Sequence, residues 1–438
     1  MAHQTFDSAT KTRALRRTVA AAIITGLTTS AIAQECFEFD RVPSPNFGTD
    51  ANFLIGAAAL SAGDAWAVGH YRAGSTQLPL SIHWDGVATE LLPMPTPPSS
   101  ISGPNVMLYD VHAFASDDVW AVGSNPPAST GSAATETLVY HWNGSAWSIV
   151  PSAIGCCGSF GSQFYSIDGV SGDDFWAVGY KANEVAANPF AAHWNGSEWE
   201  EYNLPPSTGT RNALKDLHVI ASDDIWALEG VGNGPPVAPR RIFHWDGSSW
   251  DIGAPAINSV LYFAAEAIFA FGPSDIWVSS VRASGGQIVM LHWNGSAWEQ
   301  MNVPVFAYEF FGNAPDDFYA VGNTSVMHWN GAQWSVVATI PGVPEGNIFD
   351  AELAADGTLW CAGNTQPGPA SRTLTATLVT CGPDCPPDFD GDGFVTGADF
   401  DAFVAAFESG AGTADFDGDG FITGVDFDAF VFAFEAGC

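Results

Sequence analysis

Basic residues are scarce in this chain, which has 13 Lys and Arg against 48 Asp and Glu and a formal net charge of −35 at pH 7. Proteins that bind nucleic acid or anionic membrane surfaces need clustered Lys and Arg, so neither is expected as a partner. Familiar catalytic motifs are also absent: the sequence contains no G-x-S-x-G, no H-E-x-x-H and no P-loop. The acidity instead fits an extracellular protein that binds cations.

Long apolar runs are missing as well. No stretch approaches the roughly 18 uninterrupted apolar residues of a membrane-spanning helix, so no membrane span is expected. The N-terminus instead has a basic region with Arg13, Arg16 and Arg17, a short apolar region over residues 19–27, and an A-x-A cleavage site at residues 31–33. We therefore predict that residues 1–33 are a signal peptide and that the protein is secreted, to the extracellular space or the cell surface.

What the chain does contain is a repeat. His-Trp followed by Asn-Gly or Asp-Gly occurs at His83, His141, His193, His244, His292 and His328. A segment of the form Ser-Asp-Asp-x-Trp-Ala-Val-Gly precedes the copies, as at residues 116–123. A period of roughly 40–55 residues is typical of propellers and other arrays of small sheets. We predict four strands per repeat, with the Ser-Asp-Asp turn between the first two strands and the Asn-Gly turn between the last two.

The Asn-Gly dipeptide predicts a two-residue type I′ turn, which in the second repeat would pair Trp142 with Ser145. Strand alternation then places Tyr140, Trp142 and Trp147 on one face, for packing against a neighbouring blade, and His141 on the other face. The six repeated His residues lie one per blade, too far apart to share a metal ion. We interpret each as a structural residue bonded to an Asp of the turn.

Seven blades are predicted from the landmark aromatic residue of each repeat. These residues are Trp66, Trp120, Trp176, Trp226, Trp277, Tyr319 and Trp360. The seventh repeat lacks the hairpin, and we expect residues 37–43 to supply its missing strand and close the ring. Six or eight blades remain alternatives. The repeats resemble those of secreted bacterial propellers with kelch-like blades, which implies a mainly β, seven-bladed β-propeller over residues 34–381.

The C-terminal segment repeats a calcium-loop pattern, with acids at loop positions 1, 3, 5 and 12 and Gly at position 6. The predicted ligands of the two Ca²⁺ sites are Asp388, Asp390, Asp392, Phe394 and Asp399 in the first loop and Asp415, Asp417, Asp419, Phe421 and Asp426 in the second. The two Phe residues would contribute their backbone carbonyls. Each loop is followed by Phe and Val at i, i+3, i+4 and i+7, which predicts a short helix with one apolar face.

A loop followed by a helix, repeated without entering helices and with Asp at position 12, resembles a type I dockerin. The resemblance implies a small α-helical, calcium-binding domain over residues 388–438, preceded by a linker over residues 382–387. It also implies a cohesin-like protein or a cell-surface component as partner. The loop positions that often carry polar or basic contact residues in that family are Gly397-Ala398 and Gly424-Val425 here.

Seven cysteines are compatible with disulfides in an oxidising compartment. Cys385 and Cys438 bracket the C-terminal module, and Cys36 and Cys381 border the two strands that would close the ring. We predict these two pairs as disulfides. The sequence leaves open the state of Cys156, Cys157 and Cys361, because the adjacent pair fits a strained bridge and two separate thiols equally well.

Candidate binding residues emerge when the blades are aligned on their landmark aromatic residue. Positions nine residues earlier are apolar throughout, whereas positions ten and eight earlier carry varied polar groups and share the other face of the strand. These polar residues are Asp110, His112, Asp168, Asp216, His218, Glu309, Asp350 and Glu352. We predict that they form an acidic binding site at the mouth of the central channel, and that Asp216→Ala with Asp350→Ala abolishes binding while leaving thermal stability nearly intact.

Two functions fit these features. The leading interpretation is a secreted, non-catalytic binding protein whose propeller recognises a ligand such as a polysaccharide and whose calcium module attaches it to an extracellular assembly. This interpretation is favoured because no acid, base or nucleophile constellation is recognisable. The alternative is a polysaccharide-degrading enzyme, a glycoside hydrolase or lyase acting on O-glycosyl bonds, with the propeller as its catalytic domain.

Overall fold

The computed structural model describes residues 34–35, 37–97, 105–125, 136–152, 161–182, 187–202, 204–205, 212–231, 240–258, 262–282, 285–340, 343, 346–366, 371–380, 389, 394–395, 397–416 and 421–436. The predicted signal peptide, the linker and every cysteine except Cys361 lie outside these residues. Among the described residues, no helix is long and apolar enough to cross a membrane. The chain divides into two compact units, residues 39–379 and a second unit made of the two terminal segments.

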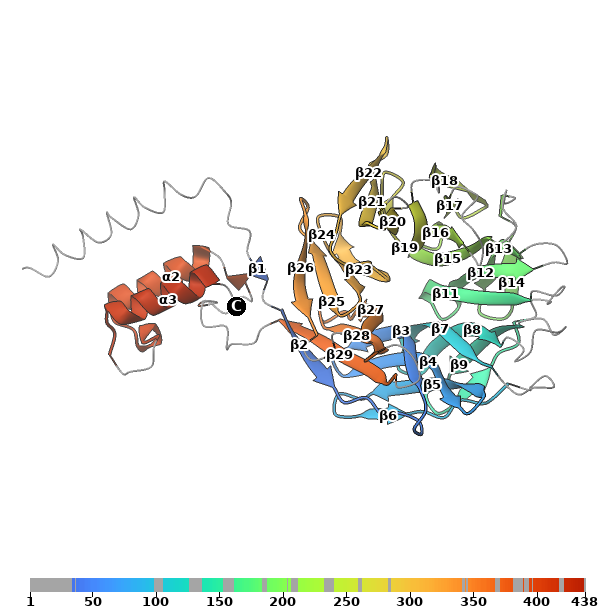
Figure 1. Ribbon diagram of the computed structural model, residues 1–438, viewed down its shortest axis with the longest axis horizontal. Helices are drawn as coiled ribbons and strands as arrows, with labels where there is room; N and C mark the ends of the chain where they lie inside the picture. The colour runs from blue at the N-terminus through green and yellow to red at the C-terminus, as the bar shows by residue number, and fades with distance from the viewer. Residues whose placement is uncertain are drawn as a thin grey trace, which may run out of the picture. The chain divides into compact units, whose positions relative to one another are not determined.

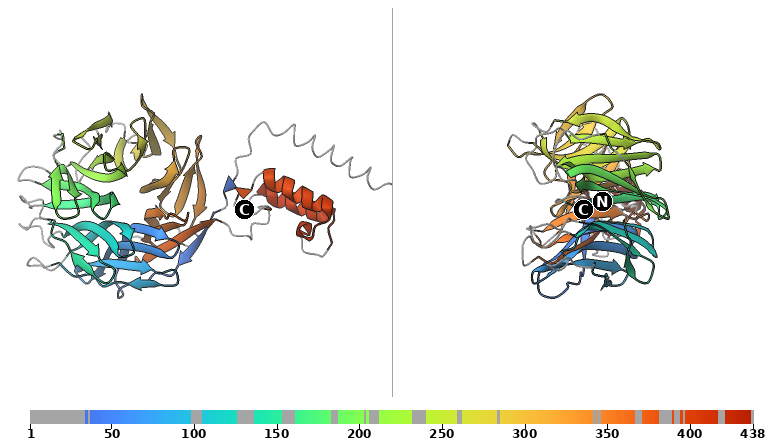
Figure 2. Two further views of the ribbon diagram at one scale, coloured as in Figure 1. Left: turned by 180° about the vertical axis from the view of Figure 1, so that it is seen from behind. Right: turned by 90° about the vertical axis from the view of Figure 1, so that its right-hand side faces the viewer.

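Seven antiparallel sheets of four strands surround a common centre (Figures 1 and 2). Blades 1 to 3 are β3 (Asn52–Ser61), β4 (Asp64–Ala73), β5 (Thr76–Trp84) and β6 (Thr89–Leu91); β7 (Met107–Ala115), β8 (Asp118–Asn125), β9 (Glu136–Trp142) and β10 (Trp147–Ile149); and β11 (Ser162–Ser171), β12 (Asp174–Ala182), β13 (Ala187–Trp194) and β14 (Trp199–Tyr202). Blades 4 and 5 are β15 (Asn212–Ala221), β16 (Asp224–Val231), β17 (Arg240–Trp245) and β18 (Trp250–Ile257); and β19 (Tyr262–Gly272), β20 (Asp275–Arg282), β21 (Ile288–Trp293) and β22 (Trp298–Asn302). Blades 6 and 7 are β23 (Glu309–Ala314), β24 (Asp317–Gly322), β25 (Ser325–Trp329) and β26 (Trp334–Thr339); and β27 (Asn347–Leu353), β28 (Leu359–Asn364), β29 (Thr373–Thr380) and β2 (Phe37–Val42).

The seventh blade is built from both ends of the propeller. Its sheet has the order β2-β29-β28-β27, so the N-terminal strand is the outer strand of the last blade. The Thr375 hydroxyl donates to the carbonyl of Val42 at 3.0 Å, and the Arg372 guanidinium donates to the carbonyl of Thr49 at 2.8 Å. The predicted closure by a borrowed strand is confirmed, and with it the count of seven blades over six or eight.

The first strand of each blade lies next to the centre, and these inner strands contact one another around the ring (Figure 1). Between blades, the aromatic faces pack as expected. Trp66 of blade 1 lies 5.3 Å from Trp142 and 5.9 Å from Trp147 of blade 2, centroid to centroid. Tyr140 is fully buried in the same cluster. The expected face of each outer hairpin is therefore confirmed.

The register of the hairpin differs from the prediction. Trp142 pairs with Trp147, not Ser145, so four residues form the loop instead of two. Gly144 has φ +83°, while the Asn143 side chain accepts the amides of Ser145 and Ala146 at 3.1 Å each. Asn is used here for its side-chain oxygen, which satisfies two turn amides, and not for a left-handed backbone.

Each repeated His is bonded to an Asp of the turn, as predicted. The His Nε2 to Asp Oδ1 distances are 2.7–2.9 Å in the pairs His83–Asp64, His141–Asp118, His193–Asp174, His244–Asp224, His292–Asp275 and His328–Asp317. Each ring also stacks on the landmark aromatic residue of its own blade, for example His244 on Trp226 with centroids 4.2 Å apart. These residues form a repeated structural unit on the turn side of the propeller.

The second unit holds α2 (Gly397–Ser409), the short 3₁₀ helix η1 (Gly412–Ala414) and α3 (Gly424–Ala436). In it, β1 (Gln34–Glu35) also pairs with β30 (Phe394–Val395). The predicted helices are present, and their Phe faces meet: Phe403 and Phe430 are fully buried and stack with centroids 3.9 Å apart. Apolar burial therefore joins the two halves of the module.

Candidate functional site

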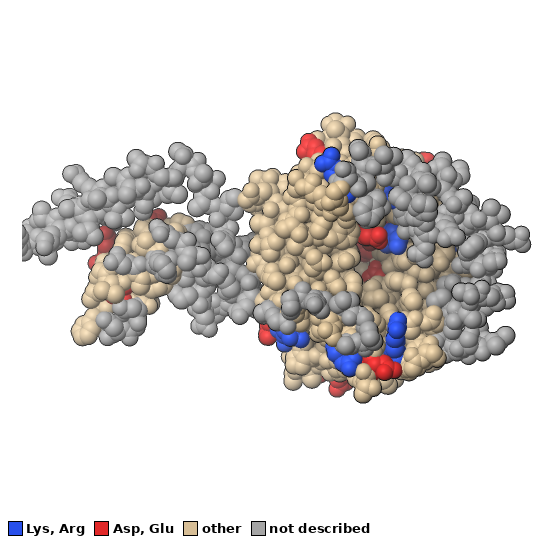
Figure 3. All heavy atoms as spheres, in the orientation of Figure 1, with Lys and Arg blue, Asp and Glu red and all other residues tan. Residues whose placement is uncertain are grey.

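The channel is hollowed at its centre on the face seen in Figure 3, where acidic residues lie in the hollow with a basic residue beside them. Its walls are the seven inner strands, which present the predicted polar positions toward one another. Asp216, Asp350 and Glu309 interact electrostatically, although they come from three different blades. The alignment of blades therefore identified residues that the fold brings together, while their binding role stays a prediction.

Four of the predicted carboxylates have a structural function. Each accepts the amide of the next residue in its own strand and an amide in the following blade. The second set of bonds joins Asp110 to Ile167, Asp168 to Val219, Asp216 to Ile268 and Asp350 to Ala57, with oxygen to nitrogen distances of 2.7–2.8 Å. Each inner strand is the edge of its sheet, so some of its backbone amides have no partner within the sheet. The carboxylates of the preceding blade accept hydrogen bonds from these amides.

The contacts of Asp216 and Asp350 argue against the expectation that both can be removed without loss of stability. Asp216 is buried and additionally accepts the hydroxyl of Ser166 at 3.1 Å. Its removal would leave the buried amide of Ile268 without that acceptor. These hydrogen bonds could not be predicted from the sequence, because the amides that donate them belong to another blade.

Burial in the channel also makes several of these carboxyl groups hard to ionise. Burial raises the pKa of Asp216 and of Asp350 to about 7, against backbone hydrogen bonds that act in the opposite direction. Burial and then the charge of Asp350 raise the pKa of Asp110 well above its ordinary value. Burial and then the charge of Asp216 do the same to the pKa of Glu309. The channel therefore holds fewer negative charges near neutral pH than its composition indicates.

One level of the channel combines two carboxyl groups, Glu352 and Asp168, and two imidazoles, His112 and His218. Burial, followed by the charges of Asp350 and Asp168, raises the pKa of Glu352 to about 8. Both oxygens of Asp168 accept backbone amides, those of Gly169 and Val219. His112 Nδ1 lies 3.6 Å from one of these oxygens and His218 Nδ1 lies 4.0 Å from the other. Burial lowers the pKa of both His residues, so they are neutral at pH 7.

Sequence analysis missed a further set of residues at the channel, eleven positions before the landmark aromatic. They are Ile55, Tyr109, Tyr165, Lys215, Glu266, Tyr308 and Phe349, and all are partly exposed. Strict alternation places them on the face opposite the channel acids, but the register shifts at this point in six of the seven inner strands. A β-bulge of this kind redirects the side chain of the extra residue.

A signal for the bulge was present in the repeat. The Gly of Ala-Val-Gly faces it: a Cβ on Gly123 would lie 2.1 Å from the carbonyl oxygen of Met107, and one on Gly179 would lie 1.9 Å from that of Gln163. An isolated Gly within a strand indicates a bulge or a close backbone approach.

No group of three or more His, Cys, Asp and Glu residues in the described part of the chain is arranged to hold a metal ion. In the C-terminal unit, Asp388, Asp390, Asp392, Asp417 and Asp419 lie outside the described residues. Asp399 and Asp426, at position 12 of the two loops, are fully buried. Asp426 accepts the amides of Phe416 at 2.8 Å and Thr423 at 2.7 Å, which draws the loop around it.

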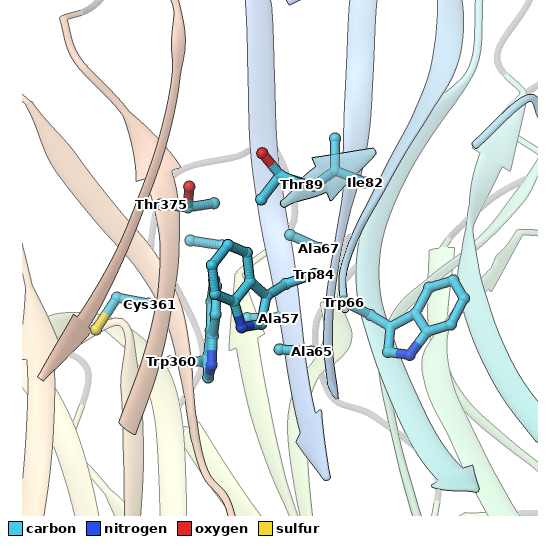
Figure 4. A pocket seen from close by; sticks show the side chains of 11 residues that line it. Ala57, Ala65, Trp66, Ala67, Ile82, Trp84, Thr89, Trp360, Cys361 and Thr375 are labelled. Carbon is cyan, nitrogen blue, oxygen red and sulfur yellow. The ribbon is translucent and has the colours of Figure 1, made fainter. Parts of the chain in front are cut away.

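In the propeller, an apolar pocket lies at the junction of blades 1 and 7 (Figure 4). Trp84 and Trp360 meet there with centroids 5.6 Å apart, beside Ala57, Ala65 and the buried free thiol of Cys361. Convergent polar groups, which orient a ligand in a binding pocket, are not found among its lining residues. We interpret it as a packing gap at the closing junction.

No protein-family model and no curated protein matches this chain. Solved structures that resemble it include a puromycin hydrolase, at a TM-score of 0.50 and 11% identity over 75% of this chain and 52% of that protein. An α-L-arabinofuranosidase from Fusarium graminearum has a TM-score of 0.42 and 10% identity over 81% of this chain and 98% of its own.

A xyloglucanase from Xanthomonas campestris has a TM-score of 0.43 and 10% identity, with coverage of 70% of this chain and 50% of its own. The chain thus spans about half the length of the puromycin hydrolase and of the xyloglucanase. At these identities the similarity concerns the fold, and it agrees with the seven-bladed propeller derived from the strand order.

Proposed function

We propose that the propeller cleaves O-glycosyl bonds in a polysaccharide, with Glu352 and Asp168 as its pair of carboxyl groups. The observation that carries the proposal is that these two groups lie at one level of the channel in different surroundings. Burial raises the pKa of Glu352 to about 8, and both oxygens of Asp168 accept backbone amides. Glycoside hydrolysis needs one carboxyl that donates a proton and one carboxylate that stabilises positive charge or activates water.

In this reaction Glu352 donates its proton to the glycosidic oxygen while the bond from that oxygen to the anomeric carbon breaks. A water molecule then adds to the anomeric carbon and gives its proton to Asp168. The neutral imidazoles of His112 and His218 flank Asp168 and are placed to bond to sugar hydroxyls or to the water. The proposal rests on these channel residues.

The experiment is release of reducing ends from a panel of polysaccharides by the full chain. Glu352→Gln and Asp168→Asn should each lower the rate by at least about a hundredfold, because each removes one half of the acid–base pair. Asp251→Asn, on the exposed outer strand β18, serves as the matched control and should leave the rate unchanged. Equal rates in all three variants would remove Glu352 and Asp168 from the reaction.

A non-catalytic binding protein is the second candidate. It is supported by the backbone amides that bond to four of the channel acids, Asp110, Asp168, Asp216 and Asp350. These bonds explain why the acids are present without any catalytic role. Binding of a polysaccharide without any product release would favour this candidate.

We further propose that the chain is exported and that residues 388–438 form a dockerin-like module holding two Ca²⁺ ions. Burial of Asp399 and Asp426 and the stacked Phe faces of α2 and α3 support this. The module would attach the propeller to a cohesin-like protein or another cell-surface component. The disulfides Cys36–Cys381 and Cys385–Cys438 belong to the same proposal, and peptide mapping without reduction tests them.

A further inference from the structure

Four of the seven residues at the position eleven before the landmark aromatic, Tyr109, Tyr165, Tyr308 and Phe349, form two aromatic groups, and all but Tyr308 lie at a bulge. Tyr109 and Tyr165 come from blades 2 and 3, with ring centroids 5.3 Å apart. Tyr308 and Phe349 come from blades 6 and 7, with centroids 5.4 Å apart. In a ring of seven blades, one group faces the other across the opening. At Tyr109, Tyr165 and Phe349 the register shift takes the residue off the alternation that a regular strand would have.

Between the two groups, blades 4 and 5 contribute one ion pair. Lys215 Nζ lies 3.7 Å from Glu266 Oε2, and it also lies 4.1 Å from the centroid of the Tyr165 ring. Lys215 therefore orients Tyr165 and supplies donors at the edge of the mouth, while Glu266 supplies acceptors. Blade 1 contributes only Ile55 at this level.

Accessibility separates these residues from their neighbours in the same strands. The preceding residues Leu54, Leu108, Phe164, Leu214 and Ile348 are completely buried. The seven residues at this position, although large and mostly aromatic, keep part of their surface at the mouth. Aromatic rings that are held by their neighbours and remain partly open lose little conformational freedom when a ligand stacks on them.

We propose that this ring of seven residues is the platform on which a neutral polysaccharide enters the channel. One face of a pyranose ring presents C–H bonds and packs on an aromatic face, while its hydroxyls bond to charged or polar groups at the edge. Lys215 and Glu266 provide those groups. The channel positions below carry Asp and Glu and no Lys or Arg, so an acidic polymer would find no cationic partner there.

The inference rests on the proposed function for the site below the platform, but it has its own test. Binding of xyloglucan, arabinan and polygalacturonate is measured by calorimetry on the full chain carrying Glu352→Gln, so that cleavage does not interfere. Tyr109→Leu with Phe349→Leu removes one ring from each group and keeps an apolar side chain, which protects folding. Ile252→Ala, an exposed apolar residue on β18, is the matched control.

A neutral polymer should bind, with affinity about tenfold weaker in the double variant and unchanged in the control. Thermal unfolding of each variant checks the fold. Equal affinity of the double variant and its parent, preference for polygalacturonate, or no binding to any of the three polymers would overturn the platform. Ring-dependent binding without hydrolysis in the unmodified chain would overturn the proposed enzyme and leave the platform standing. Hydrolysis by the unmodified chain, together with binding that does not depend on the two rings, would overturn the platform and leave the proposed enzyme standing.

Discussion

The carboxylate of Asp216 accepts the backbone amide of Ile268, in the neighbouring blade, at 2.7 Å. The bond joins two inner strands that share no ladder hydrogen bonds, so it acts directly on the contact between blades 4 and 5. Its other oxygen accepts the amide of Leu217 and the hydroxyl of Ser166. Comparable bonds from Asp110, Asp168 and Asp350 make the channel acids part of what holds the ring closed.

Asp216→Ala should therefore lower the free energy of unfolding by about 1–3 kcal/mol, because it leaves buried donors without their acceptor. Urea unfolding followed by tryptophan fluorescence measures the change. Asp251→Ala, on the exposed outer strand of the same blade, should have an effect near zero. Equal midpoints for the two variants would show that the bond between the blades contributes nothing measurable.

The raised pKa values in the channel predict that stability falls as the pH rises from 6.5 to 8.5. The pKa values are about 7 for Asp216 and Asp350 and about 8 for Glu352, against ordinary values of 3.8 and 4.5. A folded-state pKa above the unfolded value stabilises the protein below it, and that stability is lost as the pH rises through the folded-state pKa. The loss should be on the order of 2 kcal/mol.

His112 and His218 do not contribute to the change between pH 6.5 and 8.5. Because burial lowers their pKa values, they titrate below pH 6.5 and affect stability only there. Thermal unfolding at the two pH values makes the measurement. In Glu352→Gln the difference between them should shrink, since that side chain no longer titrates. A melting temperature that rises toward pH 8.5 would contradict the sign.

Activity should depend on the same proton. If Glu352 is the acid in glycoside cleavage, kcat/KM should decline as the pH rises above about 8, because the deprotonated form cannot protonate the leaving oxygen. The measurement is kcat/KM from pH 5 to pH 10 on a polysaccharide that the chain cleaves. A rate that stays constant to pH 10 would assign the acid to another residue.

The His–Asp pairs on the turn side should affect stability and not activity. His244 Nε2 lies 2.7 Å from Asp224 Oδ1, and the same oxygen accepts the indole N–H of Trp226 at 2.8 Å. His244→Ala removes the pair and the stacking contact, and the pair is partly exposed, so about 1 kcal/mol should be lost. Urea unfolding and the polysaccharide assay are run together. Lost activity at unchanged stability would indicate a site near the hairpins instead.

Calcium should bind to the C-terminal module and stabilise it. Calorimetry on the full chain should detect the two sites encoded by the paired loops, and Asp426→Ala should weaken the second of them. Chelation should reduce the helical circular dichroism signal, because carboxylates brought together without a cation repel one another. Asp401→Ala, exposed on α2, is the control. A full chain that binds no Ca²⁺ would contradict the module's assignment.

Local sequence by itself determined the strands and turns of each blade. The landmark aromatic residue, the turn Asp and the hairpin His that contact one another all belong to the same repeat. The pairing of His141 with Asp118 and the apolar face around Trp142 follow from strand alternation within one repeat. Closure by residues 37–42 was also predictable, because one repeat was short of a strand and the N-terminal segment matched it.

Tertiary structure alone decided what the channel residues do. Asp216 accepts a hydrogen bond from the amide of Ile268, which belongs to another blade. No residue spacing within the repeat of Asp216 predicts this contact. The pKa of Glu352 depends on burial and on charges from other strands. Tyr109 lies at a bulge, where the register of its strand departs from the alternation that the sequence implies. Contacts between blades join residues about 50 positions apart, and their geometry exists only once the ring has closed.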